Sequence, residues 1–419
     1  MKIGQNINLI PKMLNRHGLI SGATGSGKTV TIKTIAEQLS NEQIPCFIAD
    51  VKGDISSIAR TQPTKIYDLL GQNGLQIHTT IENMNSSLIA KLLDLSDTQS
   101  EILAILFDIA DDEEKPLNTI NDLRNIINEV QLNKEKYQPI YGTITTISLD
   151  TIKRKLRVLE KNGGNVFFNK NKTNLNDLIT IKDNKGLVNI LDSTTLINSQ
   201  SLYATFLIWL LSELYTTLPE VGDIEKPKFI LFFDEAHLLF NDMPKVILQK
   251  IEQMVRLIRS KGVGIIFCTQ LPSDIPDTIL SQLNTKIIHK LNVFTPTDKI
   301  KTNTIAQALK TDFTTITSLP KGEAIISTLN ENAQPYIIPQ SKINAPNSGF
   351  TALTEEEKAK YIVTQPINLE KPIIATQQHK VYSYHEIEMI VAEGSKEFYE
   401  ELAKCKELIR QVNEKCGIK

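Results

Sequence analysis

The sequence of 419 residues has little cysteine, a single tryptophan and almost no excess of charge of either sign. Four cysteines without a C-x-x-C pair predict neither a zinc site nor a disulfide framework, and such usage is typical of a reducing compartment. The formal net charge of −2 excludes a polycation. Any contact with nucleic acid must therefore come from a local basic patch.

Long hydrophobic runs are also missing. The start of the chain, MKIGQNINLIPKMLNRHG, lacks the basic start and apolar centre of a signal peptide. The most apolar helix candidate, LYATFLIWLLSELY, is too short to span a bilayer. With 41% hydrophobic and 22% charged residues, we expect a soluble cytoplasmic protein, built as one large α/β domain with insertions or as two smaller domains.

What the sequence does contain is a complete phosphate-binding motif, GATGSGKT, between an apolar run and a helical pattern. Glycines let successive N–H groups point inward, and the helix N-terminus adds partial positive charge below the phosphates. Lys28 is predicted to reach the phosphates and Thr29 to bind Mg²⁺. We expect nucleotide binding by the whole loop: Gly22, Ala23, Thr24, Gly25, Ser26, Gly27, Lys28 and Thr29.

A second strand, CFIAD, ends in Asp50 and continues as VKGD. Asp50 and Asp54 are then expected near the carboxyl ends of the strands, where open α/β sheets bind their ligands. Two interpretations remain open. Either these residues act on the ligand, or Asp50 caps a turn and Lys52 is solvated.

The stretch KFILFFDEAHLLF carries a second carboxylate pair after an apolar run that is typical of a buried parallel strand. Asp234 would hold Mg²⁺ and Glu235 would polarise the attacking water, which is the arrangement of a Walker B motif. The alternative is a pair of acids that only begins the next helix. The complete P-loop in the same chain favours the catalytic interpretation.

The next apolar strand, GVGIIFCTQ, ends in Gln270, which we expect between the two carboxylate strands as a sensor of the γ-phosphate. The helix before it, IEQMVRLIRS, places Arg256 and Arg259 off its apolar face. Arg259 would either favour the helix dipole or reach the nucleotide of a neighbouring subunit.

The letters DEAH also name a class of helicases, but the spacing argues against that class. Lys28 and Asp234 are 206 residues apart, and 182 residues follow His237. Helicases of the DEAH-box class keep these motifs much closer and carry a second RecA-like domain. No Ser-Ala-Thr motif follows either, so Asp234-Glu235 is interpreted as a Walker B pair.

Taken together, these motifs resemble the HerA/FtsK class of P-loop motor ATPases, most closely the bacterial HerA-like ATPases of the YjgR type. The residues that carry the resemblance lie within 10–335 and read NRHGLISGATGSGKT, FIADVKGDISSIA, FFDEAHLLF, VRLIRSKGVGIIFCTQLPSDIPDTILSQL and FTPTD. The chain departs from the family in two places. No barrel of the archaeal HerA type precedes the P-loop, and the glycine- and arginine-rich end of the YjgR type is absent.

The resemblance implies an α/β fold with a RecA-like P-loop NTPase core and a mainly parallel sheet. It also implies ATP and Mg²⁺ as ligands, a hexameric ring and translocation along DNA. Carried over, Lys28 and Thr29 bind nucleotide and metal, Asp234 and Glu235 serve metal and water, and Gln270 is the sensor. Arg259 becomes the arginine acting in trans, and Arg16, in the family's RH sequence, reaches phosphate.

Patterning divides the chain into five segments. Residues 1–80 and 176–335 are expected to form the two parts of the core, separated by a helical insertion over 81–175. Residues 336–380 are polar and proline-rich, which predicts a linker or arm, and 381–419 predict an amphipathic C-terminal helix.

Within the insertion, the helix SLDTIKRKLRVLEKNGG is expected to begin at Ser148 or Asp150. Its charges form the best local basic patch: Lys153, Arg154, Lys155 and Arg157. Such a helix is either a contact for a DNA backbone or simply a solvated face. Two functions stay open, a ring-forming DNA translocase and a nucleotide-dependent module that gates a partner such as a nuclease.

Overall fold

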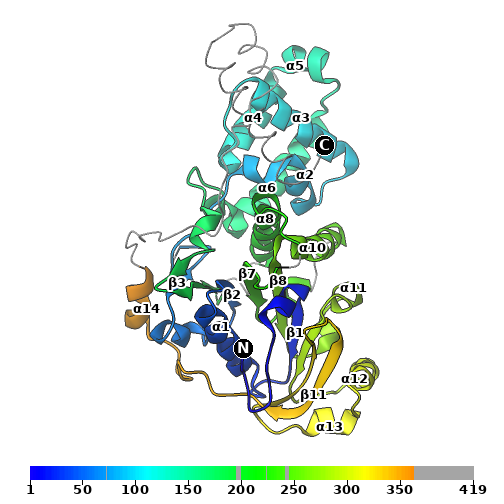
Figure 1. Cartoon of the computed structure of the whole chain (residues 1–419). Coiled ribbons are helices and arrows are strands. Elements are labelled where there is room, and N and C mark those ends of the chain that lie inside the picture. Colours follow the sequence, from blue (N-terminus) through cyan, green and yellow to red (C-terminus); the bar gives the residue numbers. More distant parts are fainter. Residues whose placement is uncertain (72, 195–199, 223, 241–244, 363–419) are drawn as a thin grey trace, which may run out of the picture. The chain divides into compact units, whose positions relative to one another are not determined.

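A nine-stranded sheet runs through the part of the chain that the structure describes, residues 1–362 apart from 72, 195–199, 223 and 241–244 (Figure 1). In this computed structural model the strand order is β11-β10-β9-β1-β8-β7-β2-β6-β3. The strands are β1 (Gly18–Ser21), β2 (Cys46–Asp50), β3 (Thr64–Tyr67), β6 (Val188–Asp192), β7 (Phe229–Phe233), β8 (Val263–Thr269), β9 (Thr285–Ile288), β10 (Glu323–Leu329) and β11 (Pro335–Lys342). A separate hairpin pairs β4 (Ile181–Lys182) with β5 (Lys185–Gly186).

The seven strands from β9 to β3 are parallel, whereas β10 and β11 are antiparallel. Register brings their ends together, with Ser21 opposite Thr269 and Phe233 opposite Phe267. We call the edge where β1, β8, β7 and β2 end the carboxyl edge, and the edge where they begin the amino edge. The sequence interpretation of the Gln270 strand was wrong: β8 lies between β1 and β7, not between the two carboxylate strands β7 and β2.

Alternate side chains of each central strand face opposite sides of the sheet, and both sides are buried. In β7, Ile230 and Phe232 belong to one cluster of buried residues, together with α1 (Lys28–Asn41). Phe229, Leu231 and Phe233 belong to the other, together with α8 (Gln200–Thr217) and α10 (Lys245–Ile258). Helices on both faces explain why the motif-bearing strands read as continuous apolar runs.

The insertion is helical. It packs on the core partly through Phe167, whose ring contacts Phe206 and Trp209 of α8 edge-on. Its last long helix begins earlier than expected, because the Thr145 hydroxyl caps it by accepting a hydrogen bond from the Ser148 amide. The helices are α2 (Ile81–Leu92), α3 (Asp97–Asp112), α4 (Ile120–Leu132), α5 (Lys134–Tyr141), α6 (Thr146–Leu159) and α7 (Asn165–Phe167).

Residues after β10 continue the core. Residues 336–342, which the sequence assigned to a linker or arm, belong to β11 (Pro335–Lys342), and this strand pairs with β10. The chain then crosses α1 and ends its described part in α14 (Glu355–Ile362). The helix expected over 381–419 lies outside the described residues. The remaining helices are α9 (His237–Phe240), α11 (Asp277–Leu280), α12 (Pro296–Ala308) and α13 (Phe313–Ser318).

Short single-turn helices fill several connections: η1 (Pro11–Arg16), η2 (Ser56–Arg60), η3 (Glu160–Gly164), η4 (Leu175–Asp177), η6 (Arg259–Lys261) and η7 (Pro272–Asp274). None of the helices in the described residues is both long and apolar enough to cross a membrane. The apolar helix α8 instead packs against the core, where its Phe206 and Trp209 are buried.

Candidate nucleotide site

The P-loop joins the end of β1 to the start of α1 at the carboxyl edge. The amide of Gly22 donates to Thr269 of β8, and the amide of Ala23 donates to Lys290 at the end of β9. The loop is therefore tied to both neighbouring strands. Position 27 favours glycine, which has no Cβ, because its φ is +128° and a Cβ there would lie 3.2 Å from the His289 ring.

Lys28 points into this loop. Its ammonium is buried and donates to the Gly22 carbonyl over 2.5 Å. Burial lowers the pKa of Lys28, although Glu235 opposes that change. The Ser26 hydroxyl is buried and has no hydrogen-bond partner among the described residues. A buried cation and an unpaired hydroxyl in a loop at the N-terminus of a helix fit the phosphates of a nucleotide.

Asp234 and Glu235 follow β7 at the same edge. Asp234 is buried, and its Oδ2 has no hydrogen-bond partner in the described part of the chain. Burial and the neighbouring Glu235 raise the pKa of Asp234 to about 6. An unpaired buried carboxylate oxygen is costly unless a ligand uses it.

Mg²⁺ fits this arrangement. It prefers oxygen ligands and keeps several waters, so a dedicated cage of protein ligands is unnecessary. Asp234 supplies a carboxylate oxygen, and Thr29 stands half-buried in the first turn of α1 to supply a hydroxyl. The described residues contain no group of three or more His, Cys, Asp or Glu side chains that would hold a metal without phosphate.

Glu235 is held by three side chains. Its Oε1 forms an ion pair with Lys52, and its Oε2 lies 3.3 Å from His237 Nδ1 and 3.5 Å from Gln270 Nε2, which donates. Burial alone would raise the pKa of Glu235, but the contacts with His237 and Lys52 lower it to about 2. Glu235 also has φ of +46°, a backbone conformation that is uncommon outside glycine.

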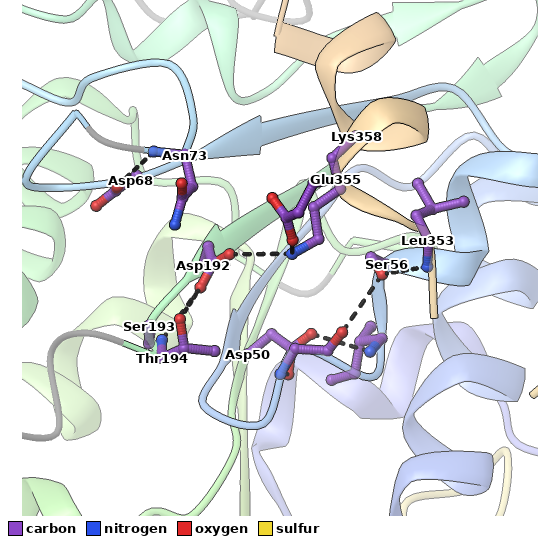
Figure 2. A network of polar contacts seen from close by, with 12 residues as sticks. Asp50, Ser56, Asp68, Asn73, Asp192, Ser193, Thr194, Leu353, Glu355 and Lys358 are labelled. Atoms are coloured by element: carbon purple, nitrogen blue, oxygen red, sulfur yellow. Dashed lines mark hydrogen bonds and ion pairs between the residues drawn. The ribbon is translucent and has the colours of Figure 1, made fainter. Parts of the chain in front are cut away.

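Asp50 turns out to shape a turn. Its carboxylate accepts hydrogen bonds from the amides of Lys52, Gly53 and Ile55, and Figure 2 shows it beside Ser56. Burial raises the pKa of Asp50 to about 7. The capping interpretation thus holds for Asp50, whereas Lys52 is not simply solvated, because it reaches Glu235.

The two arginines lie at the amino edge. Arg16 ends η1 just before β1, and Arg259 begins η6 just before β8. Seven residues of β8 put its two ends roughly 20 Å apart. Neither side chain can span that distance, so the prediction that Arg16 reaches phosphate is wrong for its own P-loop. Arg259 is exposed, as a contact with another subunit requires.

Sequence reasoning missed the role of His289. Its ring is buried below the P-loop, where Nδ1 donates to the Glu323 carbonyl and Nε2 accepts from the Thr31 hydroxyl. Burial lowers the pKa of His289 to about 4. The only signal in the sequence was a histidine at the end of an apolar run. His237, for which the sequence analysis proposed no role, also contacts Glu235.

Comparison with known proteins identifies the family of the chain. The family model described as "Helicase HerA-like C-terminal" matches residues 1–62 and 59–384. The chain belongs to this HerA-like family. The resemblance to HerA/FtsK-class P-loop ATPases that the motifs indicated is thereby confirmed.

Two relatives with sequence similarity are archaeal. The DNA double-strand break repair helicase HerA of Sulfurisphaera tokodaii is 26% identical over 335 residues, covering 75% of this chain and 62% of that protein. The "Probable helicase" of Methanocaldococcus jannaschii is 24% identical over 313 residues, covering 69% and 58%. The HerA-like chain thus spans about three fifths of the length of these relatives.

Solved structures confirm the fold. The bacterial conjugative coupling protein TrwB, in complex with an ATP analogue, matches with a TM-score of 0.58 at 15% identity over 82% of this chain and 89% of that one. VirB4 of Thermoanaerobacter pseudethanolicus matches with a TM-score of 0.54 at 13% identity, covering 79% and 90%. At such identities, the likeness establishes the α/β P-loop NTPase fold alone.

Proposed function

We propose that this HerA-like chain hydrolyses ATP and works as a ring-forming motor on DNA. The observation that carries the proposal is the convergence of Lys28, Asp234, Glu235 and Gln270 at one edge of the sheet, although they come from three separate stretches of sequence. Family membership supports the same activity, and TrwB has been solved with an ATP analogue and with ADP and Mg²⁺.

The residues divide the work of hydrolysis by position. Lys28 and the loop amides other than those of Gly22, Ala23 and Ser26 bind and orient the phosphates. Thr29 and Asp234 would hold Mg²⁺, which supplies charge neutralisation when bound. Glu235 orients the attacking water and accepts its proton. Gln270, whose side-chain amide donates to Glu235, would detect the γ-phosphate.

A ring supplies what one subunit lacks. Neither Arg16 nor Arg259 reaches the P-loop of its own subunit, yet phosphoryl transfer gains greatly from an added positive charge. Arg259 is exposed on that edge. In a head-to-tail ring, the amino edge of one subunit faces the carboxyl edge of the next, and a hexamer is the expected closure.

DNA is the proposed polymer, and α6 offers a contact. Lys153 donates to Gln131 and Lys155 donates to the Asp94 carbonyl, so these two cations are engaged within the insertion. Arg154, Arg157 and Lys161 are exposed. The proposed patch therefore keeps Arg154 and Arg157 of the four residues that the sequence suggested and adds Lys161 of η3, which follows α6.

The decisive experiment measures ATP hydrolysis with and without duplex DNA, alongside the mass of the protein with nucleotide. We expect stimulation by DNA and a hexameric mass. Changing Arg154, Arg157 and Lys161 to Glu should weaken DNA binding and reduce its salt slope by about 1 for each lost phosphate contact. A matched control changes the exposed Lys182, Lys310 and Lys321 to Glu.

An unstimulated ATPase with an unchanged salt slope would contradict the DNA motor. A nucleotide-dependent module that gates a partner, such as a nuclease, would then be the better account.

A further inference from the structure

Lys52 connects two neighbouring strands of the site. It follows β2, whereas Glu235 follows β7, and the two residues are separated by 183 positions in the sequence. Their ion pair joins a side chain that is 38% exposed to one that is 5% exposed. An exposed ion pair contributes little, but a buried carboxylate depends on its partner for orientation and charge.

The base of the Lys52 side chain is fixed. Asp50 accepts from the Lys52 amide over 3.2 Å and from the Gly53 amide over 2.8 Å. Gly53 has φ of +74°, which lets the chain turn back sharply after the strand. The lysine arm therefore leaves a turn of defined shape and ends on Glu235 Oε1.

The three contacts divide the Glu235 carboxylate. Lys52 takes Oε1, while His237 and Gln270 share Oε2. Removing Lys52 would leave one oxygen unheld and let the carboxylate rotate about its last bond.

We propose that Lys52 is a positioning residue that holds the Glu235 carboxylate toward the water that attacks ATP. The inference rests on the proposed hydrolysis and adds a residue to it. The Lys52 ammonium acts through Glu235, and the turn formed by Asp50 and Gly53 orients the Lys52 side chain.

Lys52→Met removes the charge and keeps most of the length of the arm. We expect kcat to fall between about 10-fold and 100-fold, the usual cost of misplacing a reacting group, with the Kd for nucleotide unchanged. Lys52→Arg should recover most of kcat because it restores the cation. As a control, Lys226→Met removes another Lys–Glu pair, with Glu42 at 2.9 Å, that lies before β7 at the amino edge.

A double-mutant cycle decides whether Lys52 works through Glu235. In the Glu235→Gln background, Lys52→Met should lower the residual rate no further. Additive losses, an increased rate in Lys52→Met or an unchanged kcat would each overturn the proposal. If the wild-type protein itself fails to hydrolyse ATP, the proposed function falls instead, so the two failures are distinguishable.

Discussion

The two edges of the sheet are built differently. At the carboxyl edge, buried polar atoms such as Asp234 Oδ2 and Ser26 Oγ have no partner among the described residues. At the amino edge, Asn15 Oδ1 and Arg16 Nε also lack a partner among the described residues. The buried His17 beside them has both ring nitrogens engaged, at 2.7 Å from the Val255 carbonyl and 3.0 Å from the Ile265 amide. Unpaired buried groups await a ligand, whereas a satisfied histidine fixes structure.

The comparison assigns each edge a separate task. Under the proposed function, the carboxyl edge would bind ATP and activate water within its own subunit, and the amino edge would present Arg259 to the next subunit. A variant at the carboxyl edge should therefore impair hydrolysis in its own active site. A variant at the amino edge should impair hydrolysis only in the active site of the neighbouring subunit.

The largest effect is expected for Arg259→Ala. An arginine acting in trans is worth about 10³–10⁵ in rate in known GTPases. The variant should bind ATP and assemble, yet hydrolyse poorly. Steady-state turnover, nucleotide binding and mass measured on the same preparation test all three statements.

Mixing sharpens the test. Combining Arg259→Ala with Glu235→Gln allows an intact glutamate to meet an intact arginine at some interfaces, so activity should partly recover. No recovery, or normal turnover by Arg259→Ala alone, would contradict the division between the edges.

Glu235→Gln should have the next largest effect. Losing a positioned base slows hydrolysis about 10²–10⁴-fold. Binding should remain, because Lys28 and the P-loop amides are untouched, and the variant should retain ATP. Single-turnover hydrolysis and direct binding check this; near-normal turnover would remove Glu235 from the mechanism.

Sequence patterns predicted the local parts of the site, because the P-loop and the Walker B pair each lie within a few consecutive residues. They failed where contacts join distant segments. Lys52 with Glu235 and His289 with Thr31 have no shared motif. Strand order could not be read either, since a continuous apolar run says that a strand is central but not which strands flank it.

The region after residue 335 was misjudged for a different reason. β11 is an edge strand, half-exposed and containing Pro339, so it reads as a polar linker. Beyond it, the buried Glu37 carboxylate of α1 accepts from the amides of Asn347 and Ser348, and Lys358 of α14 pairs with Asp192 (Figure 2). Such side-chain attachments leave no periodic signal.

Two buried histidines give the smallest and most selective test. Burial lowers the pKa of His17 to about 4, and Arg259 contributes to that lowering. His289, below the P-loop, has its pKa lowered similarly. His289→Asn should weaken nucleotide binding, whereas His17→Asn should spare binding and reduce turnover through Arg259. Weaker nucleotide binding in His17→Asn, with unchanged binding in His289→Asn, would contradict the proposed division of tasks between the two edges.

The pH dependence of His17→Asn follows from the same burial. Above pH 6.5, His17 is neutral in both the folded and the unfolded chain. Below pH 6.5, His17 binds a proton in the unfolded chain but stays neutral in the folded chain down to about pH 4. The wild type therefore loses up to about 3 kcal/mol of stability as the pH falls. The variant has no imidazole at this position and does not show this loss. Titration of the other buried groups is common to both proteins and cancels in the difference. Denaturant unfolding at pH 7.5, 6.0 and 5.0 should therefore show the stability gap between wild type and variant narrowing as pH falls. A gap that is constant with pH would mean that His17 is not buried in its neutral form, and the amino edge would then lose this fixed support.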